Sequence, residues 1–322
     1  MNTFKKVGLT ALAGSLVVSS AVAGEMSVAG SASIGLKNTT KTSSGKSWTM
    51  GNQLTFTGSG ELDNGMNVSL SFVLDQDDDT TLTEAAREEN SPFDSHSVTI
   101  STESMGTLVF HGEGGSSAQA AIDTTAAGDL WDNGSDNDAV KSSEGSNNML
   151  SYTLPTFVDD VTVKASYTPG AAGGPSATAW HVGYSGVEGL SLDYAEGETE
   201  TIGSQATTST LKASYAYSSF TLSYSNTEHV HDLSSQTDEE VSSWNLAYTV
   251  SDDLSIAYGT ETIETEGQAI DEENSKINVS YTTGGVTLSA TQYYFDNGGN
   301  VNTEAAATGD SERWALSATF AF

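Results

Sequence analysis

The chain has no cysteine, only four prolines, and 11 lysines and arginines against 43 aspartates and glutamates. The lack of cysteine excludes a secreted domain held together by disulfides, so stability must come from a hydrogen-bonded sheet or from bound ions. The formal net charge of −32 excludes nucleic acid as a partner, because binding the phosphate backbone requires a basic surface.

Long apolar runs are also missing, apart from one at the N-terminus. There, Lys5 and Lys6 precede an apolar stretch over 7–18, and Ala21-Val22-Ala23 forms a cleavage signature. This pattern is typical of a secretory signal peptide, whereas a membrane anchor would need about 20 apolar residues. We therefore expect residues 1–23 to be removed on export to the periplasm and residues 24–322 to form one domain.

What the chain does have is apolar residues at every second position in short stretches, for example over 68–74, 190–194, 220–224, 244–250 and 254–258. A period of two predicts β-strands. The acidity and the many small polar residues could also indicate disorder, but the regular alternation argues against it. The mean hydropathy of −0.29 is compatible with a membrane β-barrel, in which only alternate side chains contact lipid.

The connections between these stretches alternate between short and long. Short ones carry Gly, Asn and Asp, which form tight turns, and they fall at 63–65, 103–106, 155–159, 186–188, 218–219, 251–253 and 283–284. Long ones fall at 38–47, 76–94, 113–146, 169–175, 198–207, 227–239, 261–273 and 297–311. Seven short and eight long connections predict an all-β, transmembrane, antiparallel up-and-down β-barrel of about 16 strands. Counts of fourteen or eighteen stay open, because the strands around His96 and Ala179 are poorly phased.

The apolar face of these strands must point outwards. Sixteen strands enclose a lumen too wide to fill with side chains, so we expect the apolar face to contact lipid and the polar face to line water. Aromatic residues near the strand ends fit the interfacial girdles of such barrels; they are Trp180, Tyr184, Tyr194, Tyr224, Trp244, Tyr258, Tyr281, Tyr294, Trp314 and Phe320.

The final strand, 313–322, alternates and ends on Phe322. With the segments 63–66, 105–112 and 148–155, it resembles the Gram-negative general porins, and specifically those of the alphaproteobacteria, along the whole mature chain. The resemblance implies an outer-membrane channel for passive diffusion of ions and small hydrophilic solutes, without catalysis or a required cofactor. It also implies a homotrimer among lipid and lipopolysaccharide, recognition of Phe322 by the barrel-assembly machinery, and a third long loop, 113–146, folded into the pore.

Strand phasing places five cationic residues on the polar face: Lys37, Lys164, Lys212, Lys276 and Arg313. By resemblance, they face acids of the inserted loop at a pore constriction, and the candidates are Glu113, Asp123, Asp129, Asp132, Asp136 and Asp138. The alternative is that the lysines are solvated charges at the pore rim. The mature chain has only two arginines, Arg87 and Arg313, so excess negative charge should favour cations. We therefore predict cation selectivity.

Two other functions remain to be weighed. Asp77, Asp78 and Asp79 could hold Ca²⁺, as in a calcium-binding surface adhesin, but they form no EF-hand and equally fit a solvated charge cluster. An outer-membrane barrel enzyme would need a nucleophile beside His111 or His181, which share the polar phase; no catalytic motif surrounds them. A transition metal at His229 and His231 would lack an evident third ligand.

Overall fold

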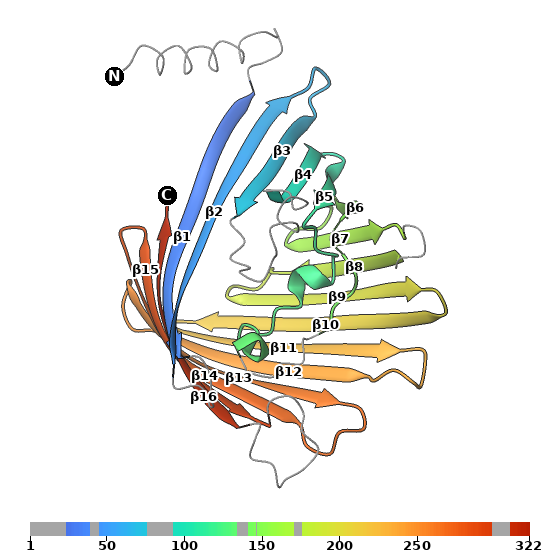
Figure 1. Ribbon diagram of the computed structural model, residues 1–322. Helices are drawn as coiled ribbons and strands as arrows, with labels where there is room; N and C mark the ends of the chain where they lie inside the picture. The colour runs from blue at the N-terminus through green and yellow to red at the C-terminus, as the bar shows by residue number, and fades with distance from the viewer. Residues whose placement is uncertain are drawn as a thin grey trace, which may run out of the picture.

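The computed structural model describes residues 24–38, 45–75, 93–133, 141–145, 147–170, 176–297 and 310–322. Within these ranges, sixteen antiparallel strands form one closed barrel (Figure 1). The strands are β1 Glu25–Asn38, β2 Lys46–Glu61, β3 Asn67–Asp75, β4 Phe93–Thr102, β5 Gly106–Glu113, β6 Met149–Thr153, β7 Val161–Thr168, β8 Ser176–Tyr184, β9 Leu190–Thr201, β10 Ser204–Tyr217, β11 Phe220–His231, β12 Glu239–Thr249, β13 Leu254–Thr265, β14 Glu272–Thr283, β15 Val286–Asp296 and β16 Ser311–Ala321. Two short 3₁₀ helices, η1 Ala120–Ile122 and η2 Leu130–Asn133, lie between β5 and β6.

Each strand pairs with its neighbours in sequence, and β1 also pairs with β16. Gly30 and Phe322 complete this seam by exchanging backbone hydrogen bonds, at 2.7 and 3.0 Å between N and O. Closure leaves no free edge among the described strands. The predicted strand number and the predicted up-and-down order are therefore confirmed.

The two faces of the wall differ as strand alternation predicts. Large apolar side chains point out of the barrel, and Leu70, Leu222 and Leu246 are 46%, 53% and 42% exposed. Inward positions carry small polar residues, and Thr208 and Thr210 are fully buried inside the barrel. The prediction that the apolar face points outwards is thus confirmed.

The predicted long loops are shorter in several places than the sequence indicated. Residues 198–207 form a hairpin with a two-residue turn at Ile202-Gly203, where Gly203 has a φ of +83°. Similarly, 227–239 shortens to 232–238, because β11 and β12 extend towards each other. Beyond the lipid-facing band both faces of a strand meet water, so the apolar alternation stops while backbone pairing continues.

No helix in the described ranges is long and apolar enough to cross a membrane. The predicted signal peptide, residues 1–23, lies outside those ranges.

Candidate functional site

The described residues between β5 and β6, which are 114–133, 141–145 and 147–148, fold into the barrel and lie along the inner wall (Figure 1). We call this segment the inserted loop. Three wall serines anchor its backbone: Ala118 N donates to Ser166 Oγ of β7 at 2.8 Å, Ala126 N to Ser225 Oγ of β11 at 2.8 Å, and Ala127 N to Ser243 Oγ of β12 at 2.9 Å. Small inward hydroxyls thus serve as acceptors for a backbone that has no strand partner. The insertion of the third long loop is confirmed.

The strongest attachment is made by Glu261 of β13, which is 1% exposed. Its carboxylate accepts hydrogen bonds from Thr125 Oγ1 at 2.7 Å, Leu130 N at 3.1 Å and Trp131 N at 2.8 Å. The last two are backbone groups at the start of η2, which have no acceptor within the helix. Bonds to an ionised acceptor are stronger than neutral ones, so Glu261 fixes the tip of the inserted loop on the wall.

Glu261 is a site residue that the sequence analysis missed, because it fell at the start of a predicted external loop. The signal was present in the alternation of β13, where Gly259, Glu261 and Ile263 share the inward face.

The inserted loop has an outgoing limb, residues 114–133, and a return limb, residues 141–145. Hydrogen bonds also join these two limbs to each other. Gln119, fully buried, donates from Nε2 to Thr210 Oγ1 of β10 at 2.9 Å and accepts from Ser143 N at 2.7 Å. The hydroxyls of Ser117 and Ser143 lie 2.6 Å apart. One glutamine therefore links the outgoing limb, the return limb and the barrel wall.

Two wall glycines allow the inserted loop to approach closely. A Cβ atom added at Gly259 of β13 would lie 2.9 Å from Ala127 Cβ, and one added at Gly197 of β9 would lie 2.4 Å from Ser143 Cβ. Both distances are too short for carbon atoms, so any side chain at either position would displace the inserted loop from the wall.

Among the predicted wall cations, Lys212 of β10 contacts the inserted loop directly, through a 2.6 Å hydrogen bond from its Nζ to Thr124 O. Asp123 lies beside it, and the pKa of Asp123 is raised to about 6. Burial is the main cause and the charge of Asp129 adds to it, whereas Lys212 acts in the opposite direction. This predicted acid and this predicted cation are therefore neighbours.

Lys276 of β14 interacts electrostatically with Asp129. Arg313 of β16 is cross-strand partner to Tyr293, and the Tyr293 hydroxyl is within electrostatic range of both Arg313 and Asp132. Asp123 and Asp129 are thus within electrostatic range of Lys212 and Lys276, while Asp132 and Arg313 share the neighbour Tyr293.

The other predicted residues lie apart from this group. Lys164 of β7 is cross-strand partner to His181, and Lys37 lies near the end of β1, opposite Ala315 of β16. Glu113, at the end of β5, has its carboxylate 3.9 Å from His96 Nδ1. Asp136, Asp138, Asp77, Asp78 and Asp79 lie outside the described residues.

Among the described residues, the wall anchors of the inserted loop run from β7 to β13, and β1 to β3 lie outside this range. Strand alternation directs hydroxyl and amide side chains inwards there; they are Ser31, Ser33, Thr49, Gln53, Thr55, Thr57, Ser69 and Ser71. The same alternation also directs Glu25, Lys37, Glu61 and Asp75 inwards at or near the strand ends, so only the middle of this wall is neutral and hydrogen-bonding.

His181 does not form a nucleophile–base pair with the serine nearest to it. His181 Nε2 lies 2.9 Å from Asp193 Oδ1, and Ser191 Oγ donates to the same carboxylate at 3.0 Å. The serine thus bonds the acid and not the imidazole, so no nucleophile–base pair results. His111 Nε2 lies 3.3 Å from Ser151 Oγ. Among the described residues, no group of three or more His, Asp or Glu side chains could hold a metal ion.

A closed sixteen-stranded barrel with an apolar exterior and an anchored internal loop defines a channel-forming outer-membrane protein. The sequence profile of the Gram-negative porins matches residues 8–282, and the chain belongs to this family.

Solved structures share the fold at low sequence identity. A loop L8 deletion mutant of OmpT, an outer membrane protein of Vibrio cholerae, is 15% identical over 94% of this chain and 100% of its own, with a TM-score of 0.68. An anion-selective porin from Comamonas acidovorans is 14% identical over 93% and 100%, with a TM-score of 0.66. Salmonella typhi OmpF, in complex with daunomycin, is 12% identical over 93% and 98%, with a TM-score of 0.68. No curated protein sequence matches the chain.

Proposed function

We propose that the protein forms a water-filled channel for passive diffusion of ions and small hydrophilic solutes across the bacterial outer membrane. The observation that carries this proposal is the inserted loop, which is anchored on one side by Glu261, Gln119 and the wall serines. A loop held in this way narrows the lumen and leaves a path along the wall of β1 to β3, which carries none of these anchors. Selectivity in such a pore depends on lumen width and lining charge.

The test is single-channel recording of the purified protein in a planar bilayer. We expect large, ohmic current steps. A folded, heat-modifiable barrel that conducts no ions would contradict the proposal.

We further propose that the channel prefers cations. The formal charge of −32 and the small number of arginines support this preference, because a lumen with excess negative charge concentrates cations. The fold does not determine whether a porin prefers cations or anions, since a porin of the same fold is described as anion-selective. Reversal potentials under a KCl gradient measure the preference directly.

A homotrimer is the proposed assembly. One structural neighbour, OmpT of Vibrio cholerae, was solved in a trimer form. All twelve tyrosines of this chain occur from Tyr152 onwards, so β1 to β5 carry none. Tyrosine girdles mark a lipid–water interface, whereas the outer face of these strands exposes residues such as Val28, Ile34, Leu70 and Leu108. We propose that two further copies of the chain cover this face.

The remaining proposals concern export and ions. We propose that residues 1–23 are a cleaved signal peptide, that the assembly machinery recognises Phe322, and that lipid and lipopolysaccharide surround the uncovered faces. The segments 63–66, 105–112 and 148–155 support a place among the alphaproteobacterial general porins. Conduction needs no cofactor in this proposal, and Ca²⁺ binds at most loosely at the acidic loops.

A further inference from the structure

The return limb of the inserted loop, residues 141–145, crosses the wall near the outer ends of β9 to β12. At one end Lys141 N donates to Glu239 Oε1 of β12 at 3.3 Å. At the other end Ser143 lies against Gly197 of β9, where an added Cβ would come within 2.4 Å of Ser143 Cβ. The limb therefore spans four neighbouring strands between two fixed contacts.

His229 of β11 lies between those two contacts. Gly197, Thr208, His229 and Glu239 are successive cross-strand partners on β9, β10, β11 and β12. His229 is 8% exposed, and its Nδ1 lies 2.7 Å from Thr208 Oγ1. Because the limb runs from Glu239 to Gly197, it lies beside His229, and Lys141 is within electrostatic range of the imidazole.

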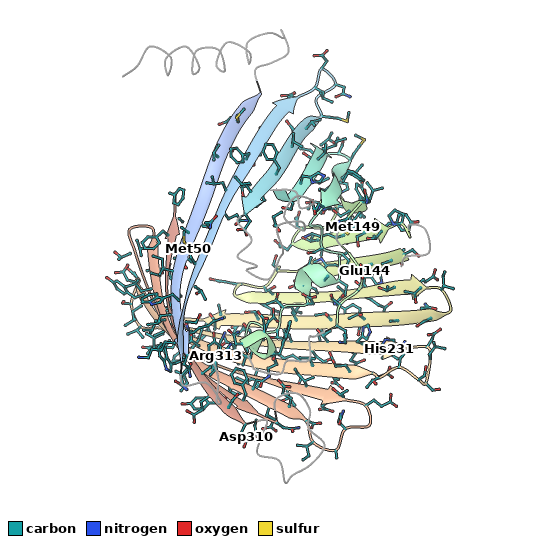
Figure 2. The ribbon with its side chains drawn as sticks, viewed as in Figure 1. Met50, Glu144, Met149, His231, Asp310 and Arg313 are labelled. Carbon is teal, nitrogen blue, oxygen red and sulfur yellow. The ribbon has the colours of Figure 1, made fainter. Side chains whose placement is uncertain are left out.

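Burial disfavours an imidazolium ion at His229, and the neighbouring groups His231 and Lys141 add to this effect, whereas Asp238 opposes it. The ring of His231 meets that of His229 edge-to-face at 4.7 Å, and Lys141 is within electrostatic range. Two carboxylates also face the site. Asp238 Oδ1 lies 3.8 Å from His231 Nδ1, and Glu239 already accepts the Lys141 N–H. Figure 2 labels His231 on the wall and Glu144 on the return limb.

We propose that His229 is a positioning residue that holds the return limb on the wall while its imidazole is neutral and releases the limb when it is protonated. A charged imidazole needs water or a counter-ion. Full hydration of the charged ring requires the limb to lift, and a bond to the cross-strand carboxylate, Glu239, competes with the bond from Lys141 N. Both routes weaken the attachment of the limb.

The sign of the effect follows from proton linkage. The attached limb favours the neutral imidazole and so binds fewer protons than the released limb. Attachment is therefore present at neutral and alkaline pH and is lost as the pH falls below about 6, the range in which histidine titrates. The barrel wall blocks movement outwards, so a released limb moves into the lumen. This inference depends on the proposed channel function, and it predicts reduced conductance in acid.

The experiment compares single-channel conductance of full-length channels at about pH 8 and about pH 5. For the wild type, we expect the large step at the higher pH to give way to smaller steps in acid. His229→Gln can still bond Thr208 but cannot be protonated, so it should keep the large step at both pH values. Lys141→Met, an exposed change that removes one like charge, should reduce the acid response and provides a second test if His229→Gln folds poorly.

His181→Gln is the matched control, because His181 is also a buried lumen histidine but bonds Asp193 and not the return limb. It should respond to acid like the wild type. Equal loss of conductance in wild type and His229→Gln, or no acid response in the wild type, would overturn the inference. A variant altered equally at both pH values would show a purely structural role for His229, which also overturns it. A wild type without conductance at either pH would instead contradict the channel function itself.

Discussion

The Glu261 carboxylate lies 2.8 Å from the backbone nitrogen of Trp131, a residue 130 positions earlier in the chain. This contact joins the tip of the inserted loop to β13. It places a buried carboxylate among groups of the inserted loop and Asn274, with Lys276 of β14 within electrostatic range.

Replacing Glu261 by glutamine should loosen the inserted loop. The neutral amide offers one acceptor in place of two oxygens, and each bond lost from a charged acceptor costs about 1.5–3 kcal/mol. We expect noisier open-channel current and a lower unfolding temperature, measured by bilayer recording and thermal scanning. Glu264→Gln, on the exposed side of the same strand, is the control and should behave like the wild type. Identical current noise in the two variants would argue against the anchor.

Gly259→Val should displace the tip of the inserted loop. Its side chain would occupy space held by Ala127, and because the wall is rigid, the inserted loop must move into the lumen. We expect a smaller conductance. Gly58→Val is the matched control, because nothing lies within 4 Å of a Cβ at that position on β2. If Gly259→Val conducts like the wild type, the close approach of the inserted loop to β13 is incorrect.

Asp123 should make ion selectivity depend on pH. Its pKa is raised from 3.8 to about 6, first by burial. As the pH falls through about 6, Asp123 therefore becomes neutral while ordinary carboxylates stay ionised, and the lumen loses one negative charge. We expect the cation preference, read from the reversal potential, to decrease over that range. Asp123→Asn should remove this step and show the weaker preference at all pH values; an unchanged pH profile would refute the assignment.

Charge on the outer face of β3 should disrupt the proposed trimer. Leu70→Lys introduces a cation where a second copy is expected to pack, so we expect monomers on native gels and by light scattering. Leu222→Lys of β11, similarly exposed, introduces the same charge on a face that should meet lipid. Both variants should be less stable because a charge on the lipid-facing side is unfavourable. Only Leu70→Lys, however, should reduce the yield of trimers. If both variants fail to form trimers, the outer face of β3 is not specifically the subunit interface.

Removal of calcium should leave conduction intact. We expect chelation with EGTA to change neither the single-channel conductance nor the mobility of the folded protein on gels. Loss of trimers or of conductance, restored by added Ca²⁺, would show that an ion at the acidic loops is structural.

The sequence could predict the barrel because strand alternation and turn chemistry are local properties. Positions 68–74 or 220–224 show their two faces without any knowledge of their partners. The ends of the strands are harder to predict from the sequence. At 198–207, for example, both faces of the strands meet water, so the apolar alternation stops although backbone pairing continues.

The contacts of the inserted loop could not be predicted in the same way. That Lys212 would meet Thr124, or Glu261 the start of η2, depends on strand register together with the path of a loop that has no periodic pattern. Alternation placed Lys212 and Lys276 on the inner face, but it could not show that they lie beside Asp123 and Asp129 along one wall.

The seam between Gly30 and Phe322 also bears on how the barrel is made. The first strand finds its second partner only in β16, Ser311–Ala321. Until those residues arrive, β1 exposes an open edge that invites pairing with other chains. Contacts of such long range form slowly. Assembly should therefore begin only after the whole polypeptide has been exported, and a copy that lacks its final strand should aggregate or be degraded instead of accumulating as a partial barrel.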